Sequence, residues 1–427
     1  MEKRHLMTAL AVAAATLTAV VPASAAPAPA AAATPPALSD FVLEPTNGNL
    51  QGIVDQLDAE LPKLGVQNIL EQANRTDAPK GADCTSPALD TMKWPLARKF
   101  CFNAGDNATA EWMPQGITTV ADAQEDQQWG TKQAILVSWY DKQDAPVKGA
   151  RVSFLDPATG NYQHVLLAYP YTNTYGNPSY EALTTPQAGD GSAVHAGGIA
   201  WYGNYLYLAD TRRGIRVFDM RYIFDIKSAT NGDVTDSKQM GRQSGKYYSH
   251  GYRYVMPQVA GYSNPGGLAT FPAEHKCNPS GPQKFSYLAL DRSPTPDTLV
   301  TGEYCAKQTD PNTHGRVAEW PMDGSTGKPK LAADGKWRAT AAHRLPKPRV
   351  QGAVPYVGRW YLSSTGNGDT GPGYLEAAKG IGVLVSDSTE QEVAIGVEDL
   401  SFWPGKNELW TVTEHVNKRI IYSTPRP

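Results

Sequence analysis

The sequence predicts an all-β fold: a β-propeller with five readable blades and room for up to seven, preceded by a short helical N-terminal extension. One phrase recurs five times in residues 114–423: a polar residue, usually with a glycine, a short apolar strand, a tight turn and an aromatic-rich second strand. From Lys99 onward, short β-rich runs alternate with clusters of Gly, Pro, Asn and Asp, as in repeat folds built of antiparallel strands. The copies begin at Gln115, His195, Asn264, Gln351 and Glu398.

The fifth copy has three evident strands, of which the last covers residues 420–422. A strand over residues 99–103 can supply the fourth. Such a strand would close the ring and remove the open edge that a linear array leaves. We therefore place the propeller at residues 98–427.

The N-terminus predicts export. Lys3 and Arg4 precede an apolar run, and Ala23-Ser24-Ala25 has the small-x-small form that signal peptidase recognises. The run is Ala-rich and shorter than the roughly 20 residues that span a bilayer, so we expect no membrane span. The prediction is a signal peptide over residues 1–25 and a secreted, extracellular protein.

Two segments separate the signal from the propeller. Residues 26–48 form an Ala/Pro-rich spacer, which we expect to be extended. Residues 49–97 form a helical extension or a pro-segment, because Ile53, Leu57 and Leu61 recur at helical spacing.

Four cysteines and no CxxC pair predict disulfides in an exported chain. Four cysteines allow three pairings. The propeller favours the local ones, Cys84–Cys101 and Cys277–Cys305.

The formal net charge of −3, with both signs interspersed, speaks against a nucleic-acid partner. The sequence has no P-loop, no HExxH and no nucleophile elbow in a strand-to-helix setting. We expect a monomer.

Propeller geometry predicts where a site lies. Residues that precede inner strands and residues that end second strands emerge on one face, the customary binding face. The predicted binding residues on it are Gln115, His195, Gln351, Glu398, Asp399, Asp210, Asn367 and Asp369. Further polar residues on that face are Asp141, Asp291 and Glu414 with His415.

The first of these residues converge on the central channel. Either they hold a divalent cation such as Ca²⁺, with His195 and Glu398 as ligands, or they fill the channel with hydrogen bonds to one another and to water. The catalytic candidates are His195 and His415 as general bases and Glu398 as an acid. The alternative for each is a structural cap or turn.

The phrases at Gln115-Gly116-Ile117 and at His195-Ala196-Gly197-Gly198-Ile199, with the second strand at residues 205–210, resemble those of secreted bacterial β-propellers of the Streptomyces type. This group includes a propeller that acts on a metalloprotease and is itself a transglutaminase substrate. The resemblance implies an extracellular protein partner, such as a protease or a transglutaminase. The implied cross-linking candidates are Gln115, Gln143, Gln308 and Gln351.

The sequence-based hypothesis is a non-enzymatic propeller that binds an extracellular macromolecule, protein or glycan, through its loop face. The alternative is a carbohydrate-active hydrolase or lyase with its site at the central channel.

Overall fold

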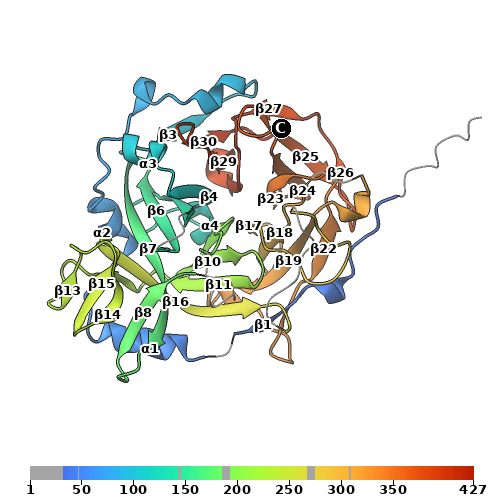
Figure 1. Ribbon diagram of the computed structural model, residues 1–427. Helices are drawn as coiled ribbons and strands as arrows, with labels where there is room; N and C mark the ends of the chain where they lie inside the picture. Colours follow the sequence, from blue (N-terminus) through green and yellow to red (C-terminus); the bar gives the residue numbers. More distant parts are fainter. Residues whose placement is uncertain (1–31, 47, 143–145, 185–192, 267–274, 307–308) are drawn as a thin grey trace, which may run out of the picture. The chain divides into compact units, whose positions relative to one another are not determined.

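The computed structural model describes residues 32–46, 48–142, 146–184, 193–266, 275–306 and 309–427. Residues 32–427 form one compact unit. Within it, five antiparallel four-stranded blades follow one another around a ring (Figure 1). The predicted propeller is confirmed, and its blade number is five. The predicted signal peptide, residues 1–25, lies outside the described residues.

In every blade the strands follow one another from the central channel outward. Blade 1 consists of β4 (Trp112–Thr119), β5 (Ile135–Asp141), β6 (Ala150–Asp156) and β7 (Asn161–Thr172). Blade 2 consists of β9 (Ile199–Tyr202), β10 (Tyr205–Asp210), β11 (Gly214–Asp219) and β16 (Tyr254–Ser263). Blade 3 consists of β17 (Tyr287–Asp291), β18 (Thr298–Gly302), β19 (Arg316–Asp323) and β22 (Ala341–Arg344). Blade 4 consists of β23 (Val350–Tyr356), β24 (Arg359–Ser364), β25 (Gly373–Lys379) and β27 (Gln391–Val393). Blade 5 consists of β28 (Ser401–Trp403), β29 (Glu408–Val412), β30 (Ile420–Thr424) and β3 (Arg98–Cys101).

Short elements decorate the blades. The helices are α1 (Leu50–Asp58), α2 (Val66–Glu71), α3 (Ala104–Ala108) and α4 (Val120–Ala123). The 3₁₀ turns are η1 (Leu38–Asp40), η2 (Gly81–Asp83), η3 (Pro87–Thr91), η5 (Pro311–Thr313) and η6 (Pro404–Lys406). The additional strands are β1 (Val42–Pro45), β2 (Lys63–Leu64), β8 (Pro178–Ala182), β12 (Ile223–Asp225), β13 (Gly232–Asp233), β14 (Met240–Gln243), β15 (Lys246–Ser249), β20 (Lys328–Pro329), β21 (Trp337–Arg338) and β26 (Val385–Ser386).

The ring closes at both its inner and its outer edge. The innermost strands β4, β9, β17, β23 and β28 each contact the next, and β28 contacts β4. At the outer edge of blade 5, β3 pairs with β30, with Arg98 opposite Ser423 and Cys101 opposite Ile420. The predicted closing strand is therefore confirmed. It joins the N-terminal part of the propeller to its C-terminal strand, so no edge of blade 5 is left unpaired there.

The glycines of the repeated phrase have a packing reason. A Cβ added to Gly116 would lie 2.7 Å from the backbone nitrogen of Ile199 in blade 2, and one added to Gly352 would lie 2.6 Å from that of Leu400 in blade 5. Real Cβ atoms do not approach so closely, so these positions need a residue without one. The glycine in these copies of the phrase is therefore required by the close packing of neighbouring inner strands.

The prediction for the third copy of the phrase is wrong. Asn264 directly follows β16, which is the outermost strand of blade 2. The phrase predicts that β17 is the second strand of blade 3, but β17 is the innermost strand of that blade. A Gly-Gly pair followed by apolar residues imitates the phrase at this point. Residues 267–274, which cover the predicted first strand, lie outside the described residues.

The N-terminal extension packs on blades 1 and 2. Helix α1 contacts β7, β8 and β16, and α2 contacts β6 and β7. Their buried apolar residues are Leu50, Val54, Leu57, Val66, Ile69 and Leu70. The predicted spacer, residues 26–48, extends too far: Val42–Pro45 forms β1, which pairs with β16 and β21. Leu43 is fully buried there, which an extended and solvated spacer would not allow.

Both local disulfides are present. Cys84 is bonded to Cys101 at the end of the closing strand β3, and Cys277 is bonded to Cys305 in blade 3. Such bonds fit an oxidising compartment. Within the described residues, no helix has the length and apolar character needed to cross a membrane.

Candidate functional site

Two glutamines at the heads of inner strands each hold a carboxyl group of blade 5. Gln115 Nε2 donates to Oε2 of Glu414 at 2.9 Å, and Gln351 Nε2 donates to Oε1 of Glu398 at 3.1 Å. Both glutamines lie at interruptions in the pairing register, of β4 with β5 and of β23 with β24. A bulge can redirect the side chain of its extra residue, and here both side-chain amides reach carboxyl groups of another blade.

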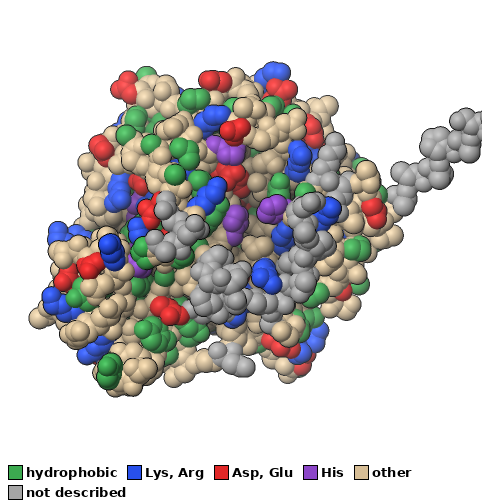
Figure 2. Space-filling view, viewed as in Figure 1, with side chains coloured by type: hydrophobic (Ala, Val, Ile, Leu, Met, Phe, Trp, Pro, Cys, Tyr) green, Lys and Arg blue, Asp and Glu red, His purple; other side chains and the backbone are tan. Residues whose placement is uncertain are grey.

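The two glutamates come from adjoining ends of one strand pair. Glu398 precedes β28 and Glu414 follows β29. The backbone nitrogen of Glu398 donates to Val412 at 3.0 Å, and that of Glu414 donates to Gly396 at 3.1 Å. Figure 2 shows acidic and histidine side chains gathered near the middle of the face in view. Blade 5 thus delivers two carboxyl groups to one end of the propeller.

Glu398 differs from Glu414 in its surroundings. Only 3% of its surface is exposed, whereas the Glu414 side chain is 27% exposed. Burial, and then the nearby charges of Glu414 and Asp399, raise the pKa of Glu398 well above its usual value. Burial thus favours the protonated form of Glu398, which is the form that a general acid needs.

Asp399, the neighbour of Glu398, joins three blades. Its Oδ2 accepts hydrogen bonds from the backbone nitrogens of Ile117 in blade 1, at 3.3 Å, and Ile199 in blade 2, at 3.4 Å. Its Oδ1 is buried and has no hydrogen-bond partner among the described residues. Burial raises the pKa of this carboxyl well above its usual value. Asp399 therefore connects the inner strands around the channel, directly beside Glu398.

His195 packs on Tyr140, a residue that was not among the predicted site residues. The ring centroids lie 4.5 Å apart. Burial, and then Glu414 and Glu398, raise the pKa of Tyr140 to about 12. Burial, and then His275 and Lys284, lower the pKa of His195 to about 4. The pair therefore offers a neutral imidazole and a phenol beside the two glutamates. The signal for Tyr140 is its place directly before Asp141, at the end of a second strand.

The second predicted histidine adjoins Glu414. Nδ1 of His415 lies 3.6 Å from Oε1 of Glu414, and the two side chains are 25% and 27% exposed. Arg419 Nε donates to the backbone oxygen of Glu414 at 2.9 Å. This is the partly open side of the cluster, where a substrate or water can reach a carboxyl group.

Other predicted residues have partners of their own. Asp210 is buried in blade 2 and forms an ion pair of 2.8 Å with Arg216. Asn367 accepts a hydrogen bond of 3.4 Å from Arg349, and the backbone oxygen of Asp369 accepts one from Lys418. Gln143 and Gln308 lie outside the described residues.

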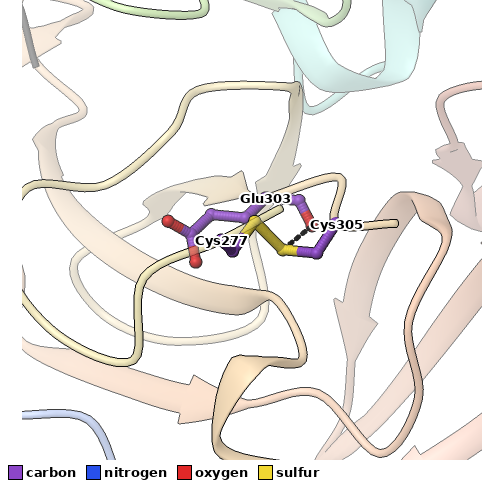
Figure 3. Close-up of side chains that lie close together, drawn as sticks. All are labelled: Cys277, Glu303 and Cys305. Atoms are coloured by element: carbon purple, nitrogen blue, oxygen red, sulfur yellow. Dashed lines mark hydrogen bonds between the residues drawn. A yellow bond between two sulfur atoms is a disulfide. The ribbon is translucent and has the colours of Figure 1, made fainter. Parts of the chain in front are cut away.

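Neither His195 nor Glu398 belongs to a group of three or more His, Cys, Asp or Glu side chains with metal-ligand spacing among the described residues. Among the described residues, the group with metal-ligand spacing is Cys277, Glu303 and Cys305 (Figure 3). The two cysteine sulfurs are bonded to each other. The Glu303 carboxylate is also engaged, with Arg316 Nη2 at 2.7 Å from its Oε1. A disulfide has no thiolate to offer, so these residues do not suit a cation.

No protein-family model matches the chain, and no curated protein matches it. Three similar solved structures are a GH43_1 enzyme from Xanthomonas citri complexed with xylose, a native arabinanase from Bacillus subtilis and a chain of the Mitotic Checkpoint Complex. The first is 11% identical with a TM-score of 0.32, over 79% of this chain and 91% of its own. The second is 10% identical with a TM-score of 0.33, over 74% and 95%. The third is 10% identical with a TM-score of 0.29, over 82% and 98%.

Two of these structures are glycoside hydrolases, which agrees with the alternative of the sequence-based hypothesis and not with its main form, a non-enzymatic binding propeller. At TM-scores of 0.32 and 0.33 this likeness carries no argument about the function. Identities of 10–11% concern the fold alone. The chemistry must be argued from the residues at the channel, where a buried carboxyl group with a raised pKa lies near a partly exposed one.

Proposed function

We propose that the protein is a glycoside hydrolase that uses Glu398 and Glu414 at the end of the central channel. The observation that carries the proposal is the contrast between the two carboxyl groups: one is buried with its pKa raised, and the other is partly exposed beside His415. Pairs of carboxyls whose environments push their pKa values apart are typical of acid and base assignments in glycosidases.

Glu398 acts as the general acid. Its proton goes to the glycosidic oxygen as the bond from that oxygen to the anomeric carbon breaks. Glu414 either takes a proton from the attacking water, which inverts the anomeric configuration, or attacks the anomeric carbon itself, which retains it. In the retaining case, water then cleaves the glycosyl ester, and the ionised Glu398 takes the proton of that water.

The test is hydrolysis of a panel of aryl glycosides, including pentosides, by the purified protein. Glu398→Gln and Glu414→Gln should each lower kcat by about 10²–10⁴-fold. Glu376→Gln is the matched control, because Glu376 is a carboxyl with 2% exposure that lies in β25 and forms an ion pair with Lys347. A folded wild-type protein that cleaves no glycoside, or two Gln variants with unchanged kcat, would rule out the proposal.

We infer further that the protein acts on a glycan outside the cell. The signal-like residues 1–25 and the two disulfides support export. N-terminal sequencing of the protein from culture medium should begin at Ala26. A cytoplasmic protein with Met1 intact would contradict it.

A further inference from the structure

A cavity of about 480 Å³ lies outside the channel cluster, between the N-terminal extension and blades 1 and 2. Three distant parts of the chain line it: the segment after α2, strand β7, and the segment between β12 and β16. The lining residues are Gln72, Asn74, Arg75, Gln163, His164, Lys227, Val234, His250, Gly251, Tyr252 and Arg253. None of the catalytic candidates belongs to this set.

The lining carries cations and no carboxylate. Arg75, Lys227 and Arg253 line the cavity, and no Asp or Glu does. Arg253 is paired with Asp225 at 2.7 Å. Lys227 is exposed, and within the described part of the chain its ammonium has neither an ion pair nor a hydrogen bond. At least one cation in this cavity therefore lacks a counter-charge.

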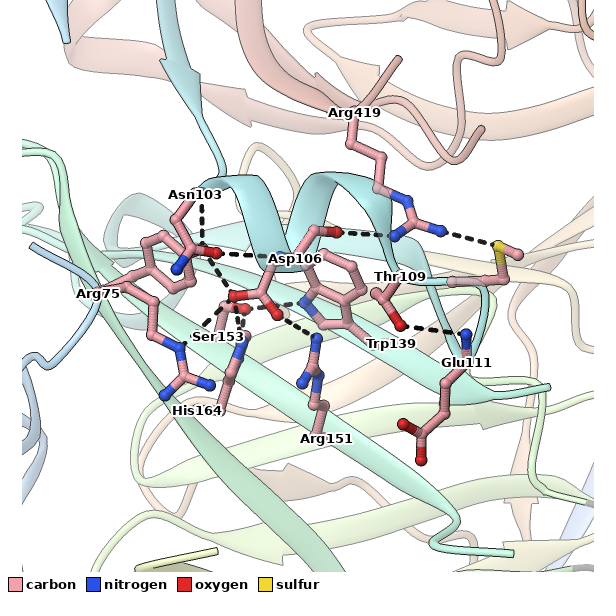
Figure 4. Close-up of polar contacts among 12 residues, drawn as sticks. Arg75, Asn103, Asp106, Thr109, Glu111, Trp139, Arg151, Ser153, His164 and Arg419 are labelled. Atoms are coloured by element: carbon pink, nitrogen blue, oxygen red, sulfur yellow. Dashed lines mark hydrogen bonds and ion pairs between the residues drawn. The ribbon is translucent and has the colours of Figure 1, made fainter. Parts of the chain in front are cut away.

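Two of the lining residues, Arg75 and His164, contact Asp106, which is not itself part of the lining. This carboxylate is shared by two guanidinium groups, Arg151 at 2.8 Å and Arg75 at 3.5 Å, as Figure 4 shows. His164 contributes a hydrogen bond to the same carboxylate, at 3.0 Å, without adding charge. Burial, and then Arg151, lower the pKa of His164 to about 3, so the imidazole is neutral. One carboxylate thus faces two permanent cations.

Arg75 is held in place rather than merely exposed. Its backbone nitrogen donates to Tyr162 of β7 at 3.1 Å, and Nη1 donates to the side chain of Asn74 at 2.6 Å. A guanidinium anchored in this way loses less conformational entropy on binding an anion than a free surface side chain does.

We propose that this cavity binds a sugar acid, a pyranose that carries a carboxylate. The carboxylate meets Lys227 and Arg75, whose charge-assisted hydrogen bonds are the strong ones. The amide of Asn74 suits ring hydroxyls, while Val234 and Tyr252 offer apolar surface to the ring. The volume falls within the roughly 300–1,000 Å³ of small-molecule sites, which is far more than a single inorganic ion occupies.

Calorimetric titration of the full chain tests the proposal with three probes: D-glucuronate, D-glucose and inorganic phosphate. Glucuronate should bind with a saturable isotherm that weakens as salt is raised, because salt screens the partly exposed cations. Glucose should not bind. Lys227→Glu should raise the glucuronate Kd by about tenfold or more. Lys330→Glu, a charge reversal at another exposed lysine, should leave it unchanged.

Asn74→Ala is a second variant, which removes the side chain that accepts a hydrogen bond from Arg75 Nη1, and it should also weaken the binding of glucuronate. Phosphate that binds as tightly as glucuronate and responds equally to Lys227→Glu would overturn the sugar acid in favour of a plain oxyanion site. Absence of glucuronate binding, or a Kd unaffected by Lys227→Glu, would overturn the site itself. These experiments measure binding alone. Their outcome therefore does not depend on whether the protein hydrolyses glycosides.

Discussion

Gln351 in blade 4 donates a hydrogen bond of 3.1 Å to the carboxyl group of Glu398 at the start of blade 5. Gln115 makes the corresponding contact to Glu414 from blade 1. Both amides come from strand bulges, so blade 5 receives one amide from each of its two neighbouring blades. An amide N–H stabilises the ionised form of a carboxyl more than the protonated form. The hydrogen bond from Gln351 therefore opposes part of the increase in the pKa of Glu398 that burial causes.

The first prediction removes this amide. Gln351→Leu should raise the pKa of Glu398 further, because the ionised form loses a donor. The basic limb of the pH profile of kcat/KM should move to higher pH, since the general acid keeps its proton longer. At its new optimum, kcat/KM should change by less than about tenfold, the value of one modest hydrogen bond. Gln391→Leu, at a glutamine of β27, should leave the profile in place. A profile that Gln351→Leu does not move would contradict this role of the amide.

The second prediction concerns Asp122, which joins α4 to blade 5. It accepts hydrogen bonds from Thr118 at 2.6 Å and from Ser401 at 2.8 Å. Burial raises its pKa from 3.8 to about 6. A carboxyl group whose pKa is raised by folding contributes its full stabilisation of the folded state below pH 3.8. This contribution is lost as the pH rises through about 6. The difference corresponds to about 3 kcal/mol.

Asp122→Asn removes this titration, because an amide stays neutral at every pH. Urea unfolding of the wild type and the variant at pH 4, 5, 6 and 7 measures it. Between pH 4 and 6 the wild type should lose about 2 kcal/mol more of its free energy of unfolding than the variant does. Other buried carboxyls, Glu398 among them, titrate in both proteins and cancel. Parallel stability curves would refute the assignment.

The sequence could predict those parts of the fold that depend on short-range pattern. The glycine of each phrase is visible because Gly116 and Gly352 lie where neighbouring backbones nearly touch. The strand at Arg98–Cys101 is recognisable because its partner blade lacks a fourth strand. The disulfides follow because each closes a short loop, of 17 and 28 residues.

Features that depend on long-range contacts could not be read in this way. Gln115 and Glu414 are 299 residues apart, and no local pattern links them. Tyr140 looks like any aromatic residue of a strand until the ring brings it against His195. The phrase at Asn264 misled because Gly-Gly before apolar residues also occurs in a connection between blades.

The third prediction tests the close approach of blades 4 and 5. In Gly352→Ala the new methyl group would lie 2.6 Å from Leu400 N and 2.9 Å from Asp399 C, so the strands must move apart. Overpacking of this kind costs about 1–3 kcal/mol. Urea unfolding should show that loss, and the shift of Asp399 should lower activity. Gly65→Ala is the control, because its nearest neighbour would lie 3.9 Å away. Equal stability of both variants would contradict the packing argument.

The fourth prediction concerns the disulfide at the closing strand. Cys84–Cys101 spans 17 residues and fastens β3, which completes blade 5. Cys84→Ser with Cys101→Ser should lower the free energy of unfolding by about 3 kcal/mol, the value for a loop of this length. Proteolysis should then cut first near β3, detected by mass spectrometry. The matched pair of changes at Cys277 and Cys305 should leave β3 protected. Cleavage that ignores β3 would exclude a role in closure.

The fifth prediction concerns Asp106, which connects α3 to blade 1. Its carboxylate contacts Arg151 at 2.8 Å, Tyr162 at 2.7 Å and His164 at 3.0 Å. Burial opposes its ionisation, but His164, Arg151 and Arg75 together hold its pKa far below the usual range. A carboxyl whose pKa is lowered by folding stabilises the folded state above its unfolded pKa of 3.8, and that stability is lost as pH falls below it.

Asp106→Asn keeps the shape of the side chain and removes its charge, which leaves the buried guanidinium of Arg151 without a counter-ion. Breaking a buried pair in this way costs about 3–5 kcal/mol. Urea unfolding at pH 7 should show that loss. The difference in the free energy of unfolding between variant and wild type should become smaller at pH 3, because part of the stability that the wild-type carboxylate contributes is lost there. Asp323→Asn, at a carboxylate on β19 that accepts from Ser325, should change stability by less than about 0.5 kcal/mol. A pH-independent difference would mean that Asn fails for reasons of shape rather than of charge.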